Sequence, residues 1–229
     1  MTDQAPNRAA VLFDIDGTLI DTNYLHVEAW GRTFDALGVP VDTWRIHRAI
    51  GMDGSKLLPA LVGEDDAKRL KPDAKRLHSA YLAETVSRLR PFRRARELLR
   101  TLAARDVQVV LATSAPQEEL ERLLVALDCE DAVAHVTSAE DVESAKPDPD
   151  IITVALAKAG VPAGHAVMVG DAVWDIEACA RAGVRCVAVL TGGTGTRELE
   201  EAGAVAIYDD VAGILAGLDE SPLAELWRT

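Results

Sequence analysis

The chain has 229 residues, of which 48% are hydrophobic, enough to bury the core of one large domain or two modest ones. Its 24 basic residues against 37 acidic ones give a formal net charge of −13, which argues against nucleic acid and anionic membranes as partners. The cysteines are odd in number and lack metal-ligand spacing, and neither a signal peptide nor a membrane-length apolar run is recognisable. We therefore expect a cytoplasmic protein with reduced thiols.

The first element that the pattern predicts is a short buried strand over residues 9–13, Ala-Ala-Val-Leu-Phe. Residues 22–89 then show apolar residues at helical spacing and no strand signal. Helices are expected at residues 21–37, 43–50, 56–61 and 65–89, the last of them broken near Pro72. An all-helical stretch after one strand predicts an inserted helical cap domain over residues 22–89.

From residue 90 onward, helices alternate with strands. The strands are expected at residues 106–112, 132–136, 165–169, 185–190 and 204–208, and the helices at residues 94–105, 118–127, 150–159, 175–182, 197–202 and 211–218. This alternation implies a parallel sheet with helices on both faces. The predicted fold class is α/β, with a Rossmann-like parallel sheet in residues 1–21 and 90–229 and the cap inserted after strand one. Ligands of such sheets bind at the carboxyl ends of the strands.

Two carboxylates, Asp14 and Asp16, stand where the first strand ends. Buried acids are costly unless a cation meets them. This place therefore suits a metal ion and a carboxylate nucleophile. The alternative is an acidic strand end followed by a turn at Gly17.

Two further segments could contribute to a phosphate site. Thr113 and Ser114 follow the strand expected at residues 106–112, where hydroxyl and backbone N–H groups can hold phosphate oxygens, although a helix N-cap is the simpler explanation. Lys146 lies in Lys-Pro-Asp-Pro-Asp, where two prolines stiffen the loop that presents its ammonium. The alternative is a surface lysine before a helix that starts at a proline.

Asp171 and Asp175 follow the apolar run Val-Met-Val-Gly. Four residues apart, they share one face if a helix begins here. Acids at a helix N-terminus are also favoured by the helix dipole, which is the alternative explanation.

These four motifs, in this order, resemble those of the haloacid dehalogenase superfamily, in particular the phosphoglycolate phosphatase and beta-phosphoglucomutase-like subgroup with a helical cap. The resemblance implies that Asp14 attacks phosphorus and that Asp16 is the general acid and base. It implies phosphate binding by Thr113, Ser114 and Lys146. It implies Mg²⁺ as cofactor, with ligands from Asp14, Asp16 and Asp171 and support from Asp175.

The start of the cap is similar to the same subgroup at Asp21-Thr22 and His26, which implies that Thr22 and His26 contact the substrate. An ordinary helix histidine is the alternative for His26. The mutases carry an arginine in the cap loop that corresponds to residues 49–55, and this chain has none there. That difference favours a monophosphate substrate.

Three functions stay open. The first is a Mg²⁺-dependent phosphatase of small phosphomonoesters, of the phosphoglycolate or sugar-phosphate type, that forms an aspartyl phosphate. The second is a phosphosugar mutase, and the third is a non-catalytic binding protein. The expected partner is a small phosphorylated metabolite.

Overall fold

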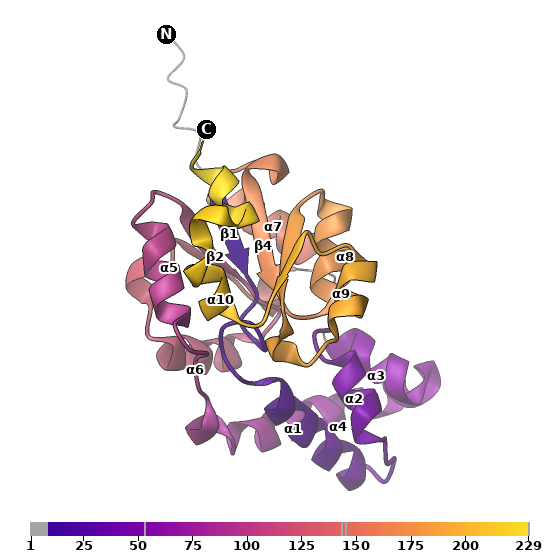
Figure 1. Ribbon diagram of the computed structural model, residues 1–229. Helices are drawn as coiled ribbons and strands as arrows, with labels where there is room; N and C mark the ends of the chain where they lie inside the picture. Colours follow the sequence, from indigo (N-terminus) through magenta and orange to yellow (C-terminus); the bar gives the residue numbers. More distant parts are fainter. Residues whose placement is uncertain (1–8, 53, 143, 145, 229) are drawn as a thin grey trace.

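The computed structural model describes residues 9–52, 54–142, 144 and 146–228 (Figure 1). Its centre is a six-stranded sheet in the order β3-β2-β1-β4-β5-β6, and every pair of neighbouring strands is parallel. The strands are β1 Ala10–Phe13, β2 Gln108–Ala112, β3 His135–Thr137, β4 Ala166–Gly170, β5 Arg185–Val189 and β6 Ala206–Tyr208. The predicted α/β fold with a parallel sheet is confirmed.

Apolar side chains on alternating positions of the strands build a core on each face of the sheet. Val11 and Phe13 belong to one cluster, while Ala10 and Leu12 belong to the other, and none of the four is exposed. The first cluster is closed by helices α5 Ala95–Ala103, α6 Gln117–Leu127 and α10 Val211–Ala216. The second is closed by α7 Asp150–Ala159, α8 Val173–Ala182 and α9 Thr196–Ala202. The sheet is therefore buried on both faces, as its continuous apolar strands require.

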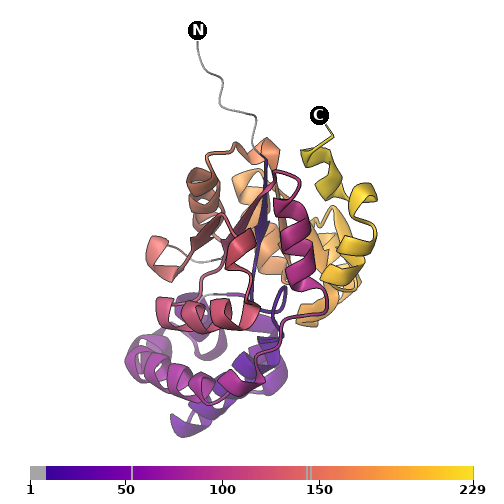
Figure 2. The same cartoon turned by 90° about the vertical axis from the view of Figure 1, so that its left-hand side faces the viewer.

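Four helices stand between β1 and α5, and we call residues 22–89 the cap. They are α1 Asn23–Ala36, α2 Thr43–Ala49, α3 Gly54–Val62 and α4 Glu64–Ala83. They lie together beyond the end of the sheet at which β1 leaves it (Figures 1 and 2). Their shared core is a cluster around Trp30, Phe34 and Leu57 that is separate from the two sheet clusters. The exact limits of the cap as a domain stay a prediction.

The chain enters and leaves the cap along two adjacent crossings. Asp21 N–H donates to the Arg90 carbonyl at 2.9 Å, and Ile20 forms an isolated bridge with Pro91. Two crossings held side by side place both ends of the cap at one point of the core.

The predicted break near Pro72 is wrong, because α4 runs without interruption through it. A proline inside a helix removes one hydrogen bond. Here Leu70 and Ala74, on either side of it, are buried and fix the helix against the rest of the cap. The predicted end at residue 89 is also too late, since α4 stops at Ala83 and a short 3-10 turn, Val86–Arg88, follows.

Among the described residues, cap and core contact each other through ion pairs, hydrogen bonds and tight backbone approaches. Arg48 pairs with Glu198, and Lys56 pairs with Asp148. Gly51 lies against α8, where an added Cβ would come within 3.0 Å of Trp174 Cδ1. Among the described helices, none is both long and apolar enough to cross a membrane.

Candidate active site

The predicted acids of β1 and β4 meet at the carboxyl edge of the sheet. β1 and β4 are neighbours in register, and the ladder continues past Phe13, because Asp14 N–H donates to the Val169 carbonyl at 3.0 Å. Asp14, Asp171 and Asp175 are all buried, and one oxygen of each lies within 4.8 Å of the others. The sheet register therefore brings together three acids that are far apart in the sequence.

Asp171 is fixed by two side chains from the first motif and the start of the cap. Thr18 Oγ1 donates to Asp171 Oδ1 at 2.7 Å, and Asn23 Nδ2 donates to Oδ2 at 2.8 Å. Two glycines make room for this carboxylate: an added Cβ would lie 2.6 Å from Oδ2 at Gly17 and 1.8 Å from it at Gly192. Gly17 also has a positive φ of 73°, which few other residues adopt.

Asp175 closes the start of α8. Its Oδ2 accepts the backbone N–H groups of Asp171 at 3.2 Å and Ala172 at 3.1 Å, which are otherwise without partners at a helix N-terminus. Its other oxygen, Oδ1, lies 2.7 Å from the ammonium of Lys146. Asp175 thus orients both the Asp171 loop and Lys146, a placement that suits the predicted supporting role.

Lys146 is almost completely buried between two carboxylates. Its Nζ lies 3.0 Å from Asp14 Oδ1 in addition to the contact with Asp175. Burial alone would lower the pKa of Lys146, but the two carboxylates outweigh it and raise that pKa above its ordinary value. The ammonium therefore stays charged in the interior.

One ammonium does not neutralise this group of acids. Burial raises the pKa of Asp14 to about 7, although Lys146 opposes the shift, and burial also raises the pKa of Asp171 well above its ordinary value. Clustered oxygen ligands with unbalanced negative charge are the donor set of a hard divalent cation. The acidic cluster therefore fits a metal ion.

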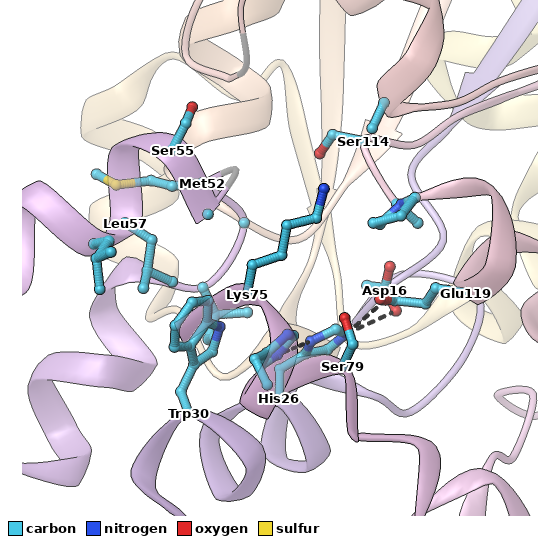
Figure 3. A pocket seen from close by; sticks show the side chains of 18 of the residues that line it. Asp16, His26, Trp30, Met52, Ser55, Leu57, Lys75, Ser79, Ser114 and Glu119 are labelled. Carbon is cyan, nitrogen blue, oxygen red and sulfur yellow. Dashed lines mark hydrogen bonds and ion pairs between the residues drawn. The ribbon is translucent and has the colours of Figure 1, made fainter. Parts of the chain in front are cut away.

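A cavity of about 350 Å³ opens between this cluster and the cap (Figure 3). Asp14, Asp16 and Lys146 lie on its core side, together with Thr113 and Ser114. The cap contributes a mostly apolar wall of Trp30, Ile50, Met52, Leu57, Leu58 and Ala74. The predicted phosphate-binding groups and the acids thus face an apolar surface across a space of the size that small ligands occupy.

Asp16 and His26 meet on the side of this cavity. His26 Nε2 lies 3.5 Å from Asp16 Oδ1 and 3.3 Å from Oε1 of Glu119 (Figure 3). Burial opposes charge on His26, but the two carboxylates raise its pKa to about 10. Burial likewise opposes charge on Asp16, yet the contact with His26 holds the pKa of Asp16 below its ordinary value. The two residues therefore form an ion pair in the cavity wall.

The second ring nitrogen of His26 faces His78 of α4. His26 Nδ1 and His78 Nε2 are 3.3 Å apart, and the ring of His78 stacks on Trp30 at 4.4 Å between centroids. Burial and the charge of His26 lower the pKa of His78 to about 3, so His78 is neutral and accepts the His26 Nδ1–H. Two cap helices are thereby linked to the core acid Asp16.

The remaining predicted residues take different places. Thr113 is buried, and its Oγ1 accepts the Ala115 N–H at 3.0 Å, while Ser114 lines the cavity. Thr22 is buried beside Asp16 and donates to the Ile20 carbonyl at 3.4 Å. Thr22 does not line the main cavity, so its predicted contact with substrate stays a prediction.

Sequence analysis missed Thr18, Asn23, Glu119 and His78. Thr18 belongs to the first motif and Asn23 follows it closely, so a hydroxyl and an amide beside a predicted acidic site were a usable signal. Glu119 and His78 lie on helix faces whose partners depend on tertiary packing, so no local pattern indicates them.

The chain is similar to known proteins over most of its length. Residues 11–189 match the model of the haloacid dehalogenase-like hydrolase family. The chain is 33% identical over 208 residues to the phosphorylated carbohydrates phosphatase of Thermotoga maritima, covering 86% of this chain and 93% of that protein. It is 31% identical over 216 residues to a phosphoglycolate phosphatase of Rhodospirillum rubrum, covering 90% and 88% of the two chains.

A crystal structure of a hydrolase from Pseudomonas syringae superimposes with a TM-score of 0.84 at 34% identity, covering 93% of this chain and 99% of that one. The predicted resemblance and the prediction of a hydrolase that acts on phosphate esters are thus confirmed at the level of the family. The chain belongs to the haloacid dehalogenase-like hydrolases.

Proposed function

We propose that this protein is a Mg²⁺-dependent phosphatase that hydrolyses small phosphomonoesters through a phosphorylated Asp14. The observation that carries the proposal is the buried ammonium of Lys146, which lies 3.0 Å from Asp14 Oδ1 at the core side of the cavity. A dianionic phosphoryl group needs positive charge next to the attacking carboxylate, and Lys146 supplies that charge from a buried position.

In the proposed reaction, the Asp14 carboxylate attacks phosphorus while the bond from phosphorus to the ester oxygen breaks. Asp16 donates a proton to the leaving oxygen and then takes one from the water that cleaves the aspartyl phosphate, which restores Asp14. Because Asp16 is ionised beside His26, the proton for this step would first pass to Asp16 Oδ1 from His26 Nε2, which lies 3.5 Å away, and would return to His26 after Asp16 has taken one from the water. Thr113 and the Ser114 N–H would orient the phosphoryl oxygens.

Mg²⁺ would be held by carboxylate oxygens of Asp14 and Asp171 and by the backbone carbonyl of Asp16, in keeping with its preference for oxygen ligands. When bound, the ion would add positive charge opposite the phosphoryl oxygens. Thr18 and Asn23 would keep Asp171 in place for this role, because each donates a hydrogen bond to one of its oxygens.

The substrate that we propose is a small phosphorylated metabolite. A cavity of about 350 Å³ accommodates a leaving group of a few carbon atoms. The names of the relatives from Thermotoga maritima and Rhodospirillum rubrum support a sugar phosphate or phosphoglycolate. The free thiols of all three cysteines support a location in the cytoplasm.

A phosphosugar mutase is the alternative from the same structural class. The resemblance implies that the mutases hold the second phosphate of their intermediate with an arginine in the cap loop that corresponds to residues 49–55. Among the described residues that line the cavity there is no arginine. The phosphatase is therefore the better supported of the two, and the complete acid set disfavours a binding protein.

The test is release of inorganic phosphate from a panel of phosphomonoesters, including p-nitrophenyl phosphate, with Mg²⁺ and with excess chelator. We expect turnover that requires Mg²⁺, needs no bisphosphate activator and is absent in Asp14→Asn. Isomerisation of a sugar phosphate without phosphate release would establish the mutase instead. Ligand binding without either reaction would leave the binding protein.

A further inference from the structure

The cavity holds as many cationic groups as acidic ones, although the whole chain is strongly acidic. Its lining acids are Asp14, Asp16, Glu119 and Glu140, and its lining cations are Lys146, Lys71, Lys75 and the protonated His26. A protein with a net charge of −13 repels an anionic substrate at long range. Cations inside the cavity therefore have to supply the attraction for a phosphorylated ligand.

Two of these cations already form ion pairs with acidic side chains. Lys146 lies between Asp14 and Asp175, and His26 lies between Asp16 and Glu119. By contrast, neither Lys71 nor Lys75 forms an ion pair within the part of the chain that the structure describes. These two ammonium groups are the ones left to meet a ligand.

Both lysines come from α4 and lie one turn apart, so they share one face of the helix. The side chain of Lys75 extends from α4 across the cavity, and its ammonium ends on the side of Ser114 (Figure 3). The charge of Lys75 also acts on Glu140, which lines the core side of the cavity. The pKa of Glu140 is lowered chiefly by the hydrogen bond from the Gln117 N–H, and the charge of Lys75 lowers it further. Lys75 thus reaches from the cap toward the core side of the cavity.

We propose that Lys75, assisted by Lys71, binds a second anionic group on the leaving part of the substrate, a carboxylate or a second phosphate. This inference rests on the proposed function and deepens it. Lys146 lies on the core floor with Asp14, whereas Lys75 comes from the cap. A substrate with a charge at each end would therefore bridge the two, with its carbon chain along the apolar wall formed by Trp30 and Leu57.

The proposal makes α4 a determinant of specificity rather than of chemistry. A hydrogen bond between charged groups contributes about ten-fold to a hundred-fold in binding. A neutral leaving group gains nothing from Lys75. The wild-type enzyme should therefore prefer an ester whose leaving group carries a negative charge over a similar ester whose leaving group is neutral. That preference should depend on Lys75.

The experiment uses matched ester pairs with wild type, Lys75→Met and Lys71→Met. The carboxylate pair is 3-phosphoglycerate with glycerol 3-phosphate, and the phosphate pair is fructose 1,6-bisphosphate with fructose 6-phosphate. We expect Lys75→Met to raise KM for the anionic member of one pair about ten-fold or more, with kcat nearly unchanged. Which pair responds tells whether the second anion is a carboxylate or a phosphate.

Lys68→Met is the matched control. Lys68 is exposed on the same helix and does not line the cavity, and it lies two turns, about 10 Å, from Lys75. The Lys68→Met substitution removes the same charge as Lys75→Met, but ions in solution screen the effect of that charge on the cavity over this distance. We expect its kinetics to match wild type.

Two outcomes would overturn the proposal while leaving the proposed function intact. One is an equal loss of kcat/KM in Lys75→Met on every ester, p-nitrophenyl phosphate included, which would mean that Lys75 contacts the transferred phosphoryl group. The other is a wild-type enzyme without preference in either pair. If no ester is hydrolysed at all, the proposed function fails. Calorimetric binding of the same pairs to Asp14→Asn, with and without Lys75→Met, would then decide the anion site by itself.

Discussion

The two sides of the cavity are held in place in different ways. On the core side, Asp14, Lys146 and Asp171 are buried, and each is fixed by contacts of 3.0 Å or less. On the cap side, Lys71 and Lys75 are exposed and unpaired in the described part of the chain. Buried, mutually fixed groups keep one geometry, whereas exposed lysines can adapt to a ligand. Under the two proposals above, chemistry and selectivity are carried by separate parts of one cavity.

Asp14→Asn is the strongest test of this division between the core side and the cap side. If the core carries the chemistry, the variant should lose turnover by about 10⁴-fold or more on every ester, whatever its leaving group. Phosphate release measures the loss, and circular dichroism checks that the fold is kept. A variant that still hydrolyses one class of ester at near wild-type rate would contradict Asp14 as nucleophile.

Lys146→Met and Lys56→Met compare a fully buried lysine with one that is only partly buried. Removal of the Lys146 ammonium leaves Asp14 and Asp175 without their cation, so the free energy of unfolding should fall by about 3–5 kcal/mol. Activity should fall by roughly 10²–10³-fold. Lys56 pairs with Asp148 at the exposed seam of cap and core, and its loss should cost no more than about 1 kcal/mol.

Urea unfolding and phosphate release on both variants give the measurement. Equal destabilisation by the two substitutions would mean that burial of Lys146 does not distinguish it from a surface ion pair.

Asp16→Ala separates proton transfer from attack. An alkyl phosphate needs a proton on its leaving oxygen, so its hydrolysis should slow by about 10²–10⁴-fold. Nitrophenolate leaves without a proton, so the first step with p-nitrophenyl phosphate should slow less. The aspartyl phosphate should then accumulate, because its hydrolysis needs Asp16 as the base. Acid quench with labelled substrate would detect it. An equal loss on both esters would contradict the role of Asp16 as an acid.

Asn23→Ala tests a cap residue that contacts Asp171, one of the buried acids. Asn23 opens α1, yet its amide donates to Asp171 Oδ2 at 2.8 Å. Loss of this bond should weaken Mg²⁺ activation about ten-fold, in the range known for residues that orient metal ligands. A Mg²⁺ titration of activity measures it. An unchanged titration would show that Thr18 alone keeps Asp171 in place.

The smallest effect is expected from Arg48→Met at the seam between cap and core. Its ion pair with Glu198 is about half exposed, so stability should change by no more than about 1 kcal/mol. If the cap moves as a lid, KM should rise slightly at low salt and match wild type at high salt, because ions screen the pair. Arg76→Met, which breaks an exposed pair with Asp73 inside the cap, is the control.

Sequence reasoning succeeded where a local pattern carries the structure. The apolar runs of β1 and β4 predict buried strands, and the acids that follow them meet because parallel strands share a carboxyl edge. It failed at Pro72, where tertiary packing of α4 overrides a local helix breaker. It also missed His78 and Glu119, which meet His26 only because the cap folds back onto α6. Contacts between helices depend on distances and angles that no single segment encodes.

The absence of side chains at Gly17 and Gly192 has an evolutionary consequence. Even a methyl group there would collide with Asp171 or Asn23. If α4 sets specificity as proposed, descendants of this gene can change substrate by replacing its exposed residues at little cost to folding. A side chain at either glycine, by contrast, would displace Asp171 or Asn23. Substrate specificity in such an enzyme would therefore change mainly through the cap wall of its cavity.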